Sequence, residues 1–98
     1  MKVNFNQPVR DYRGQALISN GQVQMLNDHI GQALYMAHSM GGNQMTPDEK
    51  YMAYKLCNKM LQQGEIEITA EEGAFIIKLC GETLISGAYG QIRELIEK

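Results

Sequence analysis

Thr46-Pro47-Asp48-Glu49 and Thr69-Ala70-Glu71-Glu72 are the two stretches that decide the fold of this chain. In each, the threonine hydroxyl can accept a hydrogen bond from the backbone N–H three residues on. The glutamate at that third position can reach back to the N–H of the threonine. Pro47 occupies a first helical position, where its missing N–H costs nothing. These two capping boxes predict that helices begin at residues 46 and 69.

Apolar spacing predicts the extent of four helices. The first is expected from about Met25–Asn27 to Met40, where Gly41-Gly42 ends it and leaves residues 41–44 as the most flexible stretch. The second runs from the first box to about Gly64, the third over about residues 70–80 and the last over about residues 87–97. The expected inner positions recur every three or four residues: Leu26, Ile30, Ala33, Leu34 and Ala37; Met52 or Ala53, Leu56, Cys57, Met60 and Leu61; Tyr89, Ile92, Leu95 and Ile96.

Short strands are expected around the helices. Val3 and Phe5 alternate with polar residues, and Asn20-Gly21 lies between two strand-like runs, which predicts a hairpin. Residues 65–68 also alternate and could pair with that hairpin. The predicted fold is α+β, with about four helices and a small antiparallel N-terminal β-hairpin sheet. Residues 1–98 form one domain, with a hairpin region at 1–24 and a helical region at 25–98.

Composition and length exclude several classes of protein. The 98 residues are 44% hydrophobic and 20% charged, which argues against disorder. The longest apolar run, residues 33–37, is far too short for a membrane span, and no apolar signal segment follows Met1. Two cysteines make no disulfide framework. A cytoplasmic protein with reduced thiols is expected.

Charge is unevenly distributed along the chain. Residues 1–27 hold three bases and one acid, for +2; residues 28–64 balance; residues 65–98 hold three bases and seven acids, for −4. A basic head and an acidic tail could favour contact between copies of the chain, or the charges could simply be solvated.

No set of residues predicts catalysis. His29 and His38 are nine residues apart on one predicted helix and so face opposite ways, which prevents a shared metal. Cys57 and Cys80 lie on apolar faces and are expected in the core. The acid pairs at 48–49 and 71–72 are explained by helix starts. We therefore expect no enzyme, no cofactor and no metal.

One face of the second predicted helix combines aromatic and basic residues. Tyr51, Tyr54, Lys55 and Asn58 lie opposite its apolar stripe. Such a face can be merely solvated, with its rings lying over the core. It can also bind protein, since tyrosine is enriched at interfaces, or it can stack nucleic-acid bases.

The third predicted helix is apolar nearly all round. From Gly73 to Gly81 its only charge is Lys78, so it needs cover on almost every side. It is therefore either the central helix of the fold or part of an interface between copies of the chain. A homo-oligomer is predicted, with an interface that includes Phe75, Ile76, Leu79, Ile92 and Leu95.

Two segments resemble a known family. The first segment is residues 1–5, which lead through Asp11-Tyr12-x-Gly14 into the hairpin. The second runs from Ile68 through Ile76-Ile77-Lys78 to residues 89–96. Together they resemble a loose family of small proteins encoded by tailed bacteriophages and prophages. The resemblance implies a phage origin and a bacterial cytoplasm, and it offers no catalytic residues. The expected function is that of a small, non-enzymatic accessory protein that acts by protein–protein contact, with a second copy and possibly a host or phage protein as partners. The alternative is a nucleic-acid-binding accessory protein that uses the Tyr51/Tyr54/Lys55 face. No membrane partner is expected.

Overall fold

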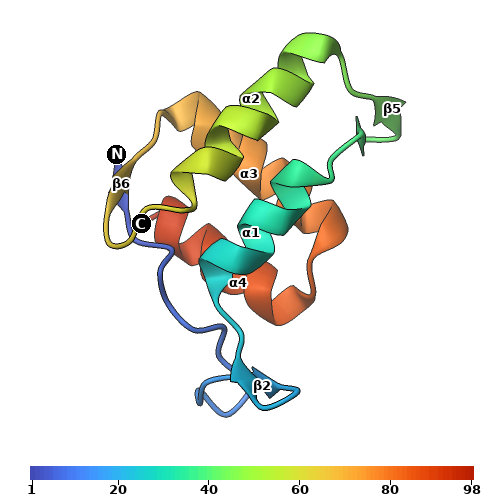
Figure 1. The fold of residues 1–98 in the computed structure, drawn as a ribbon. Helices are drawn as coiled ribbons and strands as arrows, with labels where there is room; N and C mark the ends of the chain where they lie inside the picture. Colours follow the sequence, from blue (N-terminus) through green and yellow to red (C-terminus); the bar gives the residue numbers. More distant parts are fainter.

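A layer of four helices carries three two-stranded antiparallel sheets at its edges (Figure 1). The computed structural model describes all of residues 1–98. The helices are α1 (Leu26–Tyr35), α2 (Pro47–Lys59), α3 (Ala70–Thr83) and α4 (Ser86–Ile96). The paired strands are β1 (Lys2–Val3) with β6 (Ile66–Glu67), β2 (Ile18–Ser19) with β3 (Gln22–Val23), and β4 (Ser39–Met40) with β5 (Asn43–Gln44). The predicted α+β class is confirmed.

Both capping boxes form as the sequence predicts. Thr46 Oγ1 accepts from the N–H of Glu49 at 3.2 Å, and Glu49 Oε1 accepts from the N–H of Thr46 at 2.8 Å. The matching distances at Thr69 and Glu72 are 3.0 and 2.8 Å. Each box satisfies two backbone donors that a helix start leaves open, which is why α2 and α3 begin at these residues.

The core lies between α1 and α3, which occupy the middle of the layer. α1 packs against α2 and α3, and α3 packs against α1 and α4. Each helix contributes a side chain that is fully buried: Ile30, Leu56, Ile76 and Ile92. The apolar third helix is therefore covered by its own chain. This agrees with the first alternative for it, a central helix of the fold.

The first helix is shorter than predicted. It ends at Tyr35 rather than Met40, and Ser39–Met40 forms a hairpin with Asn43–Gln44. The physical reason is the Gly41-Gly42 turn, whose φ angles of +65° and +80° suit a tight hairpin. The backbone N–H of Gly41 donates to both carboxylate oxygens of Glu82 at 2.9 and 3.0 Å, which ties the turn to α3. The sequence analysis did not predict this hairpin, and the flexibility expected for residues 41–44 stays a prediction.

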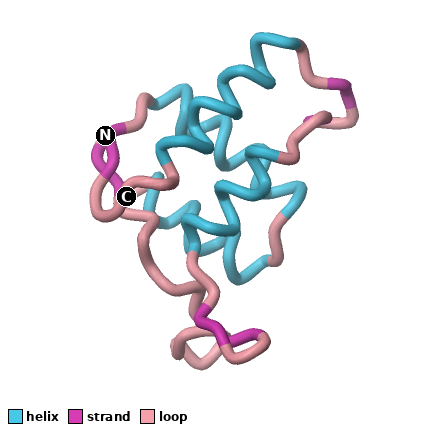
Figure 2. Tube along the Cα trace, viewed as in Figure 1, coloured by secondary structure: helices cyan, strands magenta, loops and turns pink.

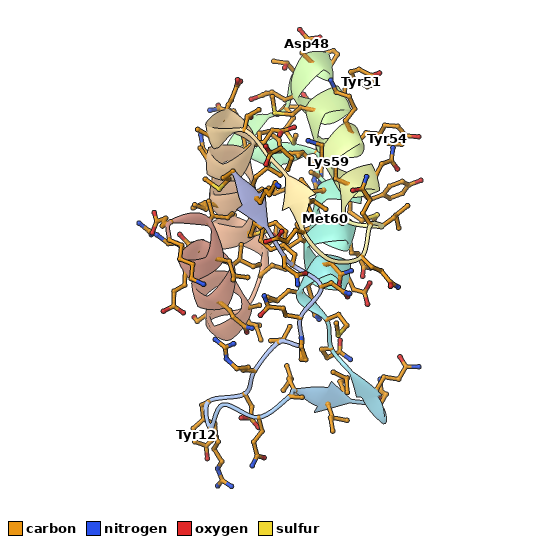
Figure 3. The ribbon with its side chains drawn as sticks, turned by 90° about the vertical axis from the view of Figure 1, so that its left-hand side faces the viewer. Tyr12, Asp48, Tyr51, Tyr54, Lys59 and Met60 are labelled. Carbon is orange, nitrogen blue, oxygen red and sulfur yellow. The ribbon has the colours of Figure 1, made fainter.

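The N-terminal strands do not form one sheet. β6 pairs with β1 and not with the hairpin, whose Asn20-Gly21 turn has positive φ at both residues as predicted. The strand segments lie at the periphery. The β2–β3 hairpin projects from the helices as part of an arm, and Tyr12 lies in a separate loop at the end of this arm (Figures 2 and 3). β1 instead brings Val3 and Phe5 into the core, where both are buried.

Candidate functional site

The tyrosine-bearing side of α2 is exposed to solvent. Tyr51 is 61% and Tyr54 52% exposed, and Lys55 and Asn58 are exposed beside them. In Figure 3 both tyrosines point away from the body of the protein. The Lys55 ammonium lies 4.8 Å from the centre of the Tyr51 ring, within the range of a cation–π contact.

Three further large side chains join this surface. Tyr35 and Met36, at the end of α1, are 68% and 67% exposed, and Leu61, just after α2, is 80% exposed. We call Tyr35, Met36, Tyr51, Tyr54 and Leu61 the α1–α2 face. Sequence reasoning missed the first two, although both lie outside the predicted inner stripe of the first helix. It placed Leu61 on the inner side of the second helix, and the exposure of Leu61 shows that this was wrong.

Close antiparallel packing of α1 and α2 shapes this face. The Cys57 thiol lies 3.3 Å from the carbonyl oxygen of Gly31 and donates to it, and Asn27 Nδ2 donates to the carbonyl oxygen of Met60 at 3.3 Å. These contacts place the start of α1 beside the end of α2. A Cβ atom at residue 31 would lie 3.5 Å from Met60 Cβ, so the two helices approach to van der Waals distance at this point.

Two hollows follow the junction of the two helices. One, of about 310 Å³, is lined by residues including Gly31, Tyr35, Met36, Cys57 and Leu61. The other, of about 360 Å³, is lined by Leu34, Tyr35, Ala37, Lys50 and Tyr54. Tyr35 borders both hollows. The arrangement offers apolar recesses edged by aromatic rings, a surface that suits the docking of side chains from another protein.

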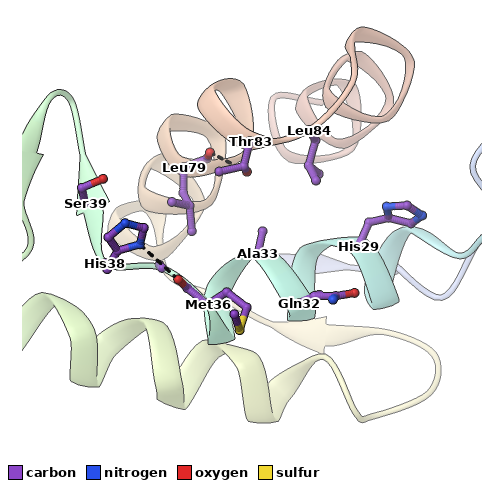
Figure 4. Close-up of a pocket in the computed structure, with 10 residues that line it drawn as sticks. His29, Gln32, Ala33, Met36, His38, Ser39, Leu79, Thr83 and Leu84 are labelled. Atoms are coloured by element: carbon purple, nitrogen blue, oxygen red, sulfur yellow. Dashed lines mark hydrogen bonds between the residues drawn. The ribbon is translucent and has the colours of Figure 1, made fainter.

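A separate hollow of about 360 Å³ lies between α1 and α3 (Figure 4). His29 and His38 lie toward its opposite ends, and Ala33 of α1 and Leu79 of α3 line it between them. The prediction that the two histidines face opposite ways on one helix was wrong, because α1 ends before His38. His29 Nε2 is 3.1 Å from Gln24 Oε1, and His38 Nδ1 is 3.4 Å from the carbonyl oxygen of Met36. No group of three or more His, Cys, Asp or Glu side chains is placed to hold a metal ion.

Other side chains that could take part in chemistry instead stabilise the fold. Glu49 and Glu72 are engaged in the capping boxes, and Glu72 also binds Lys59 at 3.2 Å. Burial raises the pKa of the Cys80 thiol to about 12, so it stays protonated. The prediction that both cysteines are in the core holds for Cys80, but Cys57 is only half-buried.

The residues predicted for an oligomer interface are mostly enclosed within the chain itself. Ile76 and Ile92 are fully buried, and Leu79 is 1% exposed. Phe75 and Leu95 are half-buried against the same core. The prediction assumed that 98 residues lack cover for the third helix, and α1 and α4 supply that cover. These residues therefore leave little free surface for contact with another molecule, and the predicted interface stays a prediction.

Comparisons with known proteins leave this surface without a precedent: no family model, no curated protein and no solved structure matches the chain. None of the four helices has the length and apolar character that crossing a membrane requires.

Proposed function

We propose that this protein is a small, non-enzymatic accessory protein that acts by protein–protein contact through its α1–α2 face. The observation that carries the proposal is the clustering of exposed apolar side chains. Five of the ten large hydrophobic residues that are exposed in this chain belong to this face. Four of them line the two hollows that share Tyr35, and exposed apolar side chains gathered in this way mark interaction sites in soluble proteins.

The composition of the face supports a protein partner. Its three tyrosines and one methionine are residue types enriched at protein interfaces, and methionine adapts its shape to what it meets. The two hollows beside Tyr35 would accept apolar side chains of the partner. The resemblance to small phage and prophage proteins favours the cytoplasm of a bacterial host as the place where the partner is met.

Photo-crosslinking in the cells that carry the gene tests this proposal. A benzophenone amino acid at position 54 should form a covalent adduct with a protein, because that position lies on the proposed contact surface. The matched control is the same amino acid at position 85, since Ile85 is also exposed, at 63%, but lies in the α3–α4 connection. Equal adduct formation at the two positions, or none at position 54, would refute the proposal.

A second candidate function is nucleic-acid binding by Tyr51, Tyr54 and Lys55. The observation that favours it is the Lys55 ammonium above the Tyr51 ring, because aromatic rings beside a base can stack nucleobases and hold phosphates. A salt-dependent mobility shift of labelled single-stranded DNA or RNA, lost in Lys55→Glu, would support this candidate. A nuclease-sensitive adduct at position 54 would support it as well.

A further inference from the structure

The two hollows of the α1–α2 face carry charges of opposite sign. Among the residues that line its two hollows, only Asp28 and Lys50 are charged, and each borders a different hollow. Asp28 lies in the first turn of α1, beside the end of α2, and Lys50 lies in the first turns of α2. The ion pairs within the chain involve other residues, so Asp28 and Lys50 are both free to meet an external charge.

This separation makes the face complementary to itself. Lys50 and Leu61 are eleven residues apart on and just beyond α2, so the two ends of the face are separated by about 16 Å. A two-fold axis near Tyr35, which borders both hollows, would turn one copy end to end over the other. Asp28 of each copy would then meet Lys50 of the other, and each contact occurs twice, as in any isologous dimer.

The area of the face is of the size that a modest dimer requires. Five large side chains that are 52–80% exposed present on the order of 600 Å² together, if a large side chain contributes roughly 150–200 Å². A stable interface buries about 800 Å² per partner, and weaker ones about 600 Å². Pairing of this face alone would therefore lie at the small end of specific interfaces, and we expect a reversible dimer.

We propose that a second copy of this chain occupies the α1–α2 face, in a two-fold dimer held by the apolar face and by reciprocal Asp28–Lys50 ion pairs. This inference rests on the proposed function, because it names the partner at the same surface. It moves the predicted homo-oligomer contact from the enclosed residues of α3 and α4 to α1 and α2.

Sedimentation equilibrium of the purified protein tests the dimer. At concentrations up to about 100 μM the mass should rise from 11.0 kDa toward twice that value. Asp28→Lys and Lys50→Glu should each weaken dimerisation about tenfold, because each replaces two attractive contacts with repulsive ones. Ile85→Glu, an exposed substitution away from the face, should leave the dimer unchanged.

A mixture of the two charge variants separates dimer contacts from effects on folding. In the mixed dimer, the lysine introduced at position 28 of one variant meets the glutamate introduced at position 50 of the other. The remaining Asp28 meets the remaining Lys50. Equimolar mixing should therefore restore wild-type affinity, and so should the double variant. A loss of helix stability, which Asp28→Lys could cause at the N-terminus of α1, would not be repaired by mixing.

Two results would overturn the inference: a mass of 11.0 kDa throughout the concentration range, or a dimer that neither charge variant weakens. The crosslinking result distinguishes failure of the dimer from failure of the proposed function. A monomeric protein that still forms an adduct with a different protein at position 54 would refute the second copy and leave the binding face intact. Absence of every adduct would refute both.

Discussion

The side-chain amide of Gln91 pairs with the backbone on both sides of the Pro8–Arg10 segment. Gln91 Oε1 accepts from the N–H of Arg10 at 3.0 Å, and Gln91 Nε2 donates to the carbonyl oxygen of Pro8 at 2.9 Å. Gln91 is 6% exposed and is the only polar side chain in the buried set. Its amide makes the two hydrogen bonds that a neighbouring β-strand would otherwise make with this backbone segment. Gln91 thereby connects the base of the projecting arm to α4.

Gln91→Leu should lower the free energy of unfolding by about 2 kcal/mol. The substitution keeps the volume but leaves a backbone donor and an acceptor without their partner. Denaturant unfolding measures the loss, and hydrogen exchange of the Arg10 amide should become faster. Gln63→Leu, at an exposed position, is the control. Equal stability of the two variants would show that Gln91 does not hold the arm.

Thr46→Ala and Thr69→Ala should each destabilise the protein by about 1 kcal/mol, the usual loss when a cap hydroxyl is removed. The comparison is Thr83→Ala, because the Thr83 hydroxyl bonds only to the Leu79 carbonyl within α3 and caps nothing. Unchanged denaturation midpoints in both cap variants would contradict this account of where the helices start.

Glu72→Gln should destabilise the protein at neutral pH by about 1 kcal/mol, and the difference from wild type should vanish in acid. Partial burial opposes ionisation of Glu72, but the Thr69 N–H and the Lys59 ammonium outweigh it and lower the pKa of this carboxyl. The stabilisation by the Glu72 carboxylate is complete above the pKa that this carboxyl has in the unfolded chain. It is lost as the pH falls through the lower pKa of the same carboxyl in the folded protein. Urea midpoints from about pH 7 to about pH 3 measure it. Glu71→Gln, at an exposed position, is the control.

Cys57 should react with a thiol reagent in the native protein, whereas Cys80 should react only after unfolding. Cys57 borders the hollow between α1 and α2, while Cys80 is fully buried and its pKa is raised to about 12. Mass spectrometry after brief labelling at about pH 8, just below the ordinary thiol pKa, distinguishes the two sites. Labelling of Cys80 at the same rate as Cys57 would place Cys80 outside the core.

Gly31→Ala should stabilise the protein by about 0.5–1 kcal/mol, because alanine favours the helix and the new Cβ fits. That atom would lie 3.5 Å from Met60 Cβ, an ordinary contact. The matched Gly73→Ala should gain less or lose stability, since its Cβ would lie 3.1 Å from Ile96 Cγ2 in the core. Thermal unfolding of both variants tests the difference, and a larger gain at residue 73 would contradict it.

Much of the fold could be predicted because its signals are local. The capping boxes join residues three positions apart, and the Asn20-Gly21 turn depends on two neighbours that tolerate positive φ. Local chemistry of this kind acts before any tertiary contact exists. The sequence by itself therefore determined where α2 and α3 begin, where the arm turns, and that the class is α+β.

Only the tertiary structure decided the rest. α1 stops at Tyr35 and is followed by a hairpin that Glu82 holds from 41 residues away, so the apolar period of the first helix could not reveal its end. The sequence also cannot say what covers the apolar side chains of Ile76, Leu79 and Ile92, because a neighbouring helix and a second molecule would suit them equally. Only the packing shows that helices of the same chain cover them. The α1–α2 face likewise depends on Tyr35 and Tyr54 meeting across two helices. Contacts between residues distant in the chain depend on how whole elements pack, because many arrangements of the same helices satisfy the same local pattern.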